Sequence, residues 1–132
     1  MSSNIELVQQ LYAAFGKGDT PALLNSMTAD VVWHSGGRAS DYPGFGPRKG
    51  HKEVQEFFTI IAENNDFVHF TPREFYAADD KVFVLGDYEL TLRKNGKKFA
   101  SDWAHIFTIR DGKVTGFREF LDTALAAECY RG

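Results

Sequence analysis

The stretch KVFVLGDYELTLRKNGKKFASDWAHIFTIRDGKVTGFREFL, residues 81–121, carries the pattern that decides the fold. β-Branched and aromatic residues alternate with polar ones along it, which is the period of a strand. Asn95-Gly96 and Asp111-Gly112 interrupt the alternation, and both dipeptides are typical of tight hairpin turns. We therefore predict a run of hairpin-linked strands. They cover residues 67–76, 81–93, 98–110 and 113–121.

Helical spacing dominates the sequence before these strands. Apolar residues recur three or four positions apart in residues 5–15 and again in residues 54–61, so each run predicts an amphipathic helix. Between them, Asp19 or Thr20 can cap a short helix that has Pro21 at its first position. Helices followed by hairpin-linked strands indicate the α+β class, with three N-terminal helices packed on one face of a curved, mostly antiparallel sheet.

A glycine- and proline-rich segment, SGGRASDYPGFGPRKG, occupies residues 35–50, directly after a predicted short strand DVVWH at residues 30–34. Its turn-forming residues are too many for a helix or a strand, and long loops in compact domains are often lids or binding loops. Tyr42 and Phe45 lie among its glycines. We predict that this loop gates a pocket and that these two rings close over a ligand.

The length and composition of the chain limit the number of its domains and the kinds of partner that it can bind. With 132 residues, 43% of them hydrophobic, the chain can bury one core, and we expect a single domain over residues 1–132. The net charge is −3 and the basic residues form no stripe, so nucleic acid is not an expected partner. There is no leader-like segment and no apolar run near the roughly 20 residues of a membrane span, and Cys129 is the only cysteine. We expect a cytoplasmic protein without membrane contact.

The order of the elements and the phrases DVVWH, RDGKV and FREFLDTA together resemble the SnoaL-like branch of the nuclear transport factor 2-like superfamily. This superfamily also contains ketosteroid isomerase and limonene epoxide hydrolase. The resemblance covers essentially the whole chain. It implies a cone-shaped fold with a mixed sheet around a deep, mostly apolar pocket, commonly in a homodimer. Because members include isomerases, cyclases, hydrolases and proteins that only bind, the fold alone does not give the function.

The resemblance to ketosteroid isomerase assigns roles to two histidines. The position of its catalytic base falls on His34, that of its protonated aspartate on His105, and that of its tyrosine one residue before Tyr12. A neutral imidazole at His34 could act as a base near pH 7, or the residue could be a core histidine bonded to a carbonyl. His105 alternates with Trp103 and Phe107 on an aromatic face, which is either the pocket wall or a surface that a dimer buries.

The last predicted strand carries two candidate acids. It resembles the last strand of limonene epoxide hydrolase, whose catalytic aspartate matches Asp122, although the arginine of that enzyme's second motif is missing here. SnoaL-type cyclases pair a histidine in the penultimate strand with an acid in the last, and either Glu119 or Asp122 could be that acid. Alternation lets only one of them face the pocket, and the resemblance favours Asp122. Asp122 also precedes the helix-forming TALAAECY, where it could act only as an N-cap.

These residues lead to two functional hypotheses. The first is an enzyme that needs no cofactor and performs acid–base chemistry, as an isomerase, cyclase or hydrolase, on a small and largely apolar molecule. His34 and Asp122 would form its proton-transfer pair, with His105 as a further catalytic candidate. The second is a protein that binds such a molecule without converting it. His34, His69 and His105 lack the spacing of metal ligands, so no metal is expected.

Aromatic residues and one arginine are expected to contact the small molecule. Arg118 could be a substrate clamp, an ion-pair partner of Asp122 or a solvated charge. The expected contacts are Tyr12, Phe15, Trp33, Tyr42, Phe45, Phe57, Tyr88, Arg118 and Phe120. We also expect a homodimer formed through the sheet, because the strands carry large apolar residues on both faces and one helical layer covers only one face.

Overall fold

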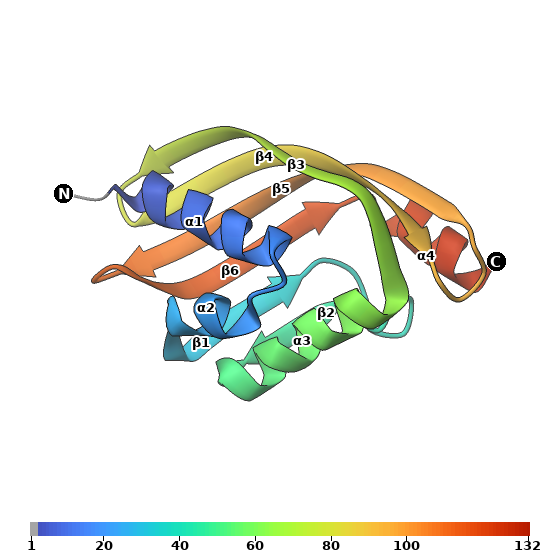
Figure 1. Cartoon of the computed structure of the whole chain (residues 1–132), viewed down its shortest axis with the longest axis horizontal. Helices are drawn as coiled ribbons and strands as arrows, with labels where there is room; N and C mark the ends of the chain where they lie inside the picture. The colour runs from blue at the N-terminus through green and yellow to red at the C-terminus, as the bar shows by residue number, and fades with distance from the viewer. Residues whose placement is uncertain (1–2) are drawn as a thin grey trace.

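The structure is a computed structural model that describes residues 3–132. Three N-terminal helices lie across one face of a curved sheet, and a fourth helix packs at its end (Figure 1). The elements are α1 (Asn4–Gly16), α2 (Thr20–Asn25), β1 (Met27–Ser35), β2 (Gly46–Lys49), α3 (Gly50–Asn64), β3 (Asn65–Ala78), β4 (Lys81–Leu92), β5 (Lys98–Arg110), β6 (Lys113–Leu121) and α4 (Thr123–Arg131). The predicted α+β class is confirmed.

The sheet is mixed, as predicted. Its six strands follow the order β2-β1-β6-β5-β4-β3. All neighbouring strands run antiparallel except β1 and β6, which run parallel. The first strand therefore enters the sheet beside the last one, and residues from both ends of the sequence become neighbours.

Local signals set the bounds of the first helices. The Ser3 hydroxyl caps α1 by accepting the backbone N–H of Glu6 at 3.0 Å, and the Asp19 carboxylate caps α2 by accepting that of Ala22 at 3.1 Å. The cap of α2 is thus Asp19. After α1 ends, Gly18 adopts a left-handed φ of +69°, which turns the chain into α2. None of the helices in residues 3–132 has the length and apolar character that crossing a bilayer requires.

The hairpin-linked strands are confirmed with nearly the predicted bounds. β5 and β6 coincide with the predicted ranges, and β4 ends one residue earlier than predicted. Asp111 and Gly112 have φ angles of +51° and +75°, the left-handed pair that a tight Asp-Gly turn requires. The segment predicted as a continuous loop contains β2, which becomes a strand by pairing with the open edge of β1 despite its glycine and proline.

The core lies between the helices and the concave face of the sheet. Buried and more exposed residues alternate along β4 and β5, so every second side chain points into the core. Gly86 in β4 lets the ring of Trp103 approach the backbone, since a Cβ there would lie 2.5 Å from a Trp103 ring carbon. Trp103 in turn stacks on Phe70 of β3, with ring centroids 5.0 Å apart. The inner face is consequently lined with closely packed aromatic rings.

Candidate functional site

The helices and the inner face of the sheet enclose a cavity of about 100 Å³. Its wall is mostly apolar, and many of its side chains are aromatic rings. Besides the indole N–H of Trp33, polar groups come from seven of the lining residues: Tyr12, Ser35, Tyr42, Asn65, Tyr88, His105 and Glu119. Within the described part of the chain, no lysine or arginine lines it. An apolar cavity with a few polar groups is typical of a small-molecule site.

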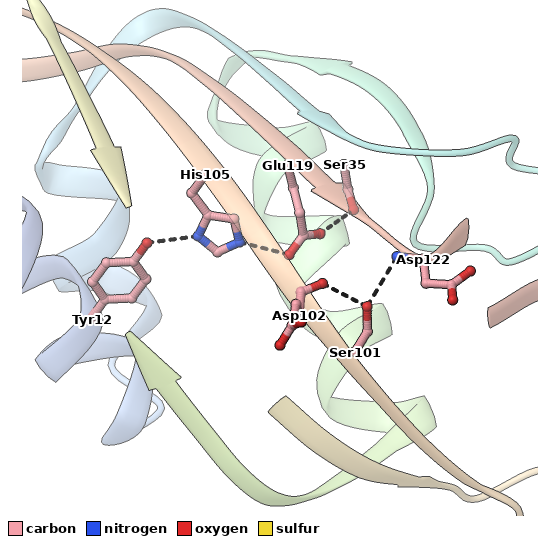
Figure 2. A network of polar contacts seen from close by, with 7 residues as sticks. All are labelled: Tyr12, Ser35, Ser101, Asp102, His105, Glu119 and Asp122. Atoms are coloured by element: carbon pink, nitrogen blue, oxygen red, sulfur yellow. Dashed lines mark hydrogen bonds and ion pairs between the residues drawn. The ribbon is translucent and has the colours of Figure 1, made fainter. Parts of the chain in front are cut away.

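Four of these polar residues form a continuous hydrogen-bonded row, which we call the buried tetrad: Tyr12, His105, Glu119 and Ser35 (Figure 2). The Tyr12 hydroxyl lies 2.7 Å from His105 Nδ1, and His105 Nε2 lies 2.8 Å from Glu119 Oε2. The Ser35 hydroxyl donates to Glu119 Oε1 at 2.6 Å. His105 and Glu119 are only 4% and 8% exposed, so the pair is shielded from bulk water.

Strand register brings the tetrad together. His105 of β5 and Glu119 of β6 are direct cross-strand partners, and Ser35 of β1 is the partner of Glu119 on its other side. Three adjacent strands therefore place three side chains in one row on the inner face. Tyr12 completes the row from α1, which lies across this face (Figure 1).

The hydrogen-bond geometry matches one tautomer of His105. With Glu119 as a carboxylate, which only accepts hydrogen bonds, and His105 as a neutral imidazole, Nε2 donates to Glu119 and the lone pair on Nδ1 accepts the Tyr12 hydroxyl. Burial, with the Glu119 charge as a second cause, raises the pKa of Tyr12, so Tyr12 stays protonated at neutral pH. Trp103 stacks on the imidazole at 3.9 Å between centroids and holds its plane. His105 is thus held in one tautomer.

His34 lies on the opposite side of the sheet, which corrects the expectation that it faces the pocket. Trp33 and Ser35 point inward from β1 and line the cavity, whereas His34 between them points outward. Its cross-strand neighbour is the exposed Arg118. Burial, and secondly the positive charge of Arg118, lower the pKa of His34.

Asp122 does not face the cavity either, so the expected pair of His34 and Asp122 is wrong. Asp122 is exposed and caps α4, with its Oδ1 accepting the backbone N–H of Leu125 at 3.0 Å. Its own N–H donates to the Ser101 hydroxyl at 3.0 Å. In Figure 2 its carboxylate points away from the tetrad. The sequence offered both roles for Asp122, and the geometry is that of the N-cap.

This placement predicts the outcome of two substitutions. Asp122→Asn should leave the free energy of unfolding nearly unchanged, because asparagine caps about as well as aspartate. Asp122→Ala should lower it by about 1 kcal/mol, because the first turn of α4 loses an acceptor. Urea denaturation of the three proteins measures both values. Equal losses for the asparagine and alanine variants would contradict the capping role.

Seven of the nine residues expected to contact a ligand line the cavity: Tyr12, Phe15, Trp33, Tyr42, Phe45, Phe57 and Tyr88. Arg118 and Phe120 do not, which corrects that part of the expectation. Both lie on the outer face, and the Arg118 guanidinium sits over the Phe120 ring at 4.8 Å. Alternation is the reason, because Glu119 between them points inward. The role of residues 35–50 as a gate stays a prediction.

The sequence patterns did not lead us to predict that two polar residues, Ser35 and Asn65, line the cavity. Ser35 could have been found, because it alternates with Trp33 and shares its face. Asn65 stands where α3 passes into β3, and no sequence pattern marks it. Within residues 3–132, no three His, Cys, Asp or Glu side chains come close enough to hold a metal ion together.

Comparisons with known proteins agree with this architecture. The family described as SnoaL-like domain matches residues 8–117. An NTF2-like protein from Burkholderia pseudomallei is 27% identical, with a TM-score of 0.90 over 100% of both chains. TerC, co-crystallized with polyporic acid, is 32% identical, with a TM-score of 0.86 over 99% of this chain and 100% of TerC. A protein with a ketosteroid isomerase-like fold from Catenulispora acidiphila, in complex with trimethylamine, shares the fold at 17% identity, with a TM-score of 0.78 over 96% of this chain and 93% of the other. Among curated proteins, none matches this chain.

Proposed function

Because this chain belongs to the SnoaL-like domain family, we propose that it is a cofactor-independent enzyme that performs acid–base chemistry on a small, largely apolar substrate. The reaction would be an isomerisation, a cyclisation or a hydrolysis. The observation that carries the proposal is the buried tetrad in the wall of an apolar cavity. A carboxylate that orients a histidine, and a histidine nitrogen with a lone pair, are the parts that general base catalysis needs.

His105 is the base in this mechanism. Glu119 accepts the Nε2–H and so keeps the lone pair on Nδ1. When the substrate arrives, Tyr12 turns aside. An acidic C–H or O–H of the substrate, or the attacking water in the case of a hydrolysis, takes its place and gives its proton to Nδ1. The Glu119 carboxylate stabilises the imidazolium that forms, and Ser35 holds the second carboxylate oxygen in position. Return of the proton to another substrate atom restores the neutral ring.

The cavity restricts the substrate. Aromatic rings dominate its wall, and such rings pack well against flat unsaturated molecules. The similarity to TerC, which was co-crystallized with polyporic acid, supports a small-molecule ligand at this site. A cavity of about 100 Å³ is smaller than the roughly 300–1,000 Å³ of common ligand pockets. The substrate is therefore small, or residues 35–50 move to admit it.

Binding without conversion is the second candidate function. One observation favours it: both ring nitrogens of His105 already have protein partners. A substrate reaches Nδ1 only if Tyr12 gives up its hydrogen bond. A protein that simply holds an apolar molecule would gain stability from such a satisfied network and need no free base.

A ligand screen followed by an exchange assay separates the two functions. Ketones, lactones, epoxides and aromatic acids are first tested for a rise in melting temperature, since a ligand that binds the native state stabilises it. Each ligand found is then incubated with the protein in D2O, and proton NMR follows conversion or solvent deuterium uptake. An enzyme accelerates one of these reactions, and the Glu119→Gln protein does so far less. Ligands that bind and stay unchanged would favour the binding function.

We also propose that two copies associate through the outer face of the sheet. Leu85 of β4 and Phe120 of β6 are 42% and 46% exposed there, and each is the cross-strand neighbour of Ala104 in β5. Phe83 and Ile106 form a second apolar pair beside them. The helices α1, α2 and α3 cover the other face and leave this one open (Figure 1). A stable contact here would bury more than roughly 1,000 Å² in total.

The predicted assembly can be broken by a single charge. Leu85→Lys should convert the two-chain species into single chains, because association would bury an ammonium group without a partner in each copy. Light scattering at micromolar concentration measures the mass of both proteins. Glu128→Lys places the same side chain on α4, away from this face, and should leave the mass unchanged. A single-chain mass for the unaltered protein would reject the dimer.

A further inference from the structure

Two tyrosine hydroxyls in the cavity wall lie outside the buried tetrad. Tyr42, from the loop between β1 and β2, accepts a hydrogen bond from the Asn65 amide at 2.7 Å, and its own proton has no acceptor among residues 3–132. Tyr88, from β4, makes no side-chain hydrogen bond to any described residue. The Tyr88 side chain is 8% exposed and lines the cavity. Both hydroxyl protons are thus available to a ligand.

The two tyrosines are donors in the wall of one cavity of about 100 Å³. Burial raises the pKa of Tyr42 to about 12; the hydrogen bond from Asn65 acts in the opposite direction, and Tyr130 and Glu119 add smaller upward contributions. Burial, followed by the charges of Glu119 and Tyr42, raises the pKa of Tyr88 well above its usual value. Both phenols therefore stay protonated at neutral pH. Both tyrosines line the same small cavity as Glu119 and His105 of the tetrad.

The remaining polar groups of the cavity wall favour an acceptor on the ligand. Both oxygens of Glu119 are already bonded, one to His105 and one to Ser35. Both protons of the Asn65 amide are used, on Tyr42 and on the Ile61 carbonyl. A carbonyl oxygen can accept two hydrogen bonds and offers no proton that would need a partner. Because no lysine or arginine among residues 3–132 lines the wall, an anionic ligand would meet no cationic side chain from them to compensate its charge.

We propose that Tyr42 and Tyr88 jointly bind one carbonyl oxygen of the substrate, which is a neutral ketone or a related carbonyl compound on an apolar frame. This inference rests on the proposed acid–base function and deepens it. When His105 removes a proton from the carbon next to a carbonyl group, negative charge develops on that oxygen. Two preplaced O–H donors stabilise that charge more strongly than they bind the neutral carbonyl. The tyrosine pair would therefore both orient the substrate and lower the barrier.

The test uses two single-ring probes of similar size, acetophenone and ethylbenzene, which differ in the carbonyl group. Calorimetric titration gives the dissociation constant of each probe for the unaltered protein and for Tyr42→Phe, Tyr88→Phe and Tyr130→Phe. Tyr130 packs against Tyr42 but does not line the cavity, so its variant is a matched control. We expect acetophenone to bind more tightly than ethylbenzene. Tyr42→Phe and Tyr88→Phe should each weaken acetophenone binding about three- to tenfold, the effect of one lost hydrogen bond, and change ethylbenzene binding less than about twofold.

A spectroscopic measurement gives the same answer without substitutions. The carbonyl ¹³C resonance of bound acetophenone should lie near its position in a hydrogen-bonding solvent, not near its position in an apolar one. A resonance at the apolar position, ethylbenzene binding as tightly as acetophenone, or equal losses for both probes in the phenylalanine variants would each overturn the proposal. None of these readouts involves turnover. Failure of the acid–base function, seen as full activity of Glu119→Gln, is therefore distinguishable from failure of the tyrosine pair.

Discussion

Glutamine in place of Glu119 is expected to lower the turnover of an identified substrate by a factor of about 10²–10⁴, the usual contribution of a general base. The carboxylate accepts the Nε2–H of His105, and a glutamine amide can instead present an N–H at that position. The ring would then carry its proton on Nδ1, the atom that has to act as the base. The amide also lacks the charge that stabilises the imidazolium.

Steady-state kinetics distinguish this effect from a loss of fold or of binding. We expect kcat to fall by the full factor while KM changes little, because Glu119 acts through His105 and holds no part of the substrate itself. The ligand-induced rise in melting temperature should persist. Asp122→Asn removes the same charge three residues further along and should keep full turnover, since Asp122 lies outside the cavity. Unchanged kcat in Glu119→Gln would exclude the tetrad as the catalytic group.

Alanine in place of Phe117 is expected to lower the free energy of unfolding by about 3–5 kcal/mol. The Phe117 ring stacks on Trp33 at 3.8 Å between centroids and meets the edges of His105 and Phe107 at 4.8 Å and 5.0 Å. Its removal leaves a hole between rigid rings that cannot close over it. The substitution also removes the ring that packs against the His105 imidazole, so His105 should become less ordered.

Phe120→Ala is the matched control, because it removes the same side chain from the other face of β6. Phe120 is half-exposed, so its removal should lower the free energy of unfolding by less than about 1 kcal/mol. Urea denaturation should be done at a concentration at which light scattering shows single chains for both variants, so that weakened association does not contribute. Similar losses for the two alanines would mean that the faces of β6 are assigned the wrong way round.

Most of the fold could be predicted because its signals are local. Strand alternation and the Asn-Gly and Asp-Gly turns act within a few residues, and they set β5 and β6 at the bounds found. The strand β2 could not be predicted in this way. Gly46 and Pro47 disfavour a strand, and only the free edge of β1 makes them part of one. The contact with β1 makes residues 46–49 a strand, and the local sequence carries no signal for that contact.

The arrangement of the site could be predicted only in part from local sequence patterns. Alternation correctly separated Glu119 from Asp122, but which face is inner depends on where the helices pack. The neighbours of the two acids carried that information, because Glu119 shares its face with Phe117 and Leu121. The resemblance to limonene epoxide hydrolase instead favoured Asp122, and we predicted Asp122 as the acid for that reason. The partners of the tetrad lie 84 to 93 residues apart in the sequence for Ser35 with Glu119 and Tyr12 with His105, beyond the reach of any local pattern.

The place of β1 beside β6 has a consequence for how the molecule folds. The hairpins of β3, β4, β5 and β6 can form from neighbouring residues, but β1 needs the last strand before it can pair on that side. During synthesis, β1 leaves the ribosome without its partner on that side, and about eighty further residues follow before β6 appears. Long-range pairing of this kind is slow because a large loop has to close first. Recovery of activity after dilution from denaturant should therefore lag behind recovery of strand content, since Tyr12 and Ser35 reach His105 and Glu119 only when the two ends of the chain dock.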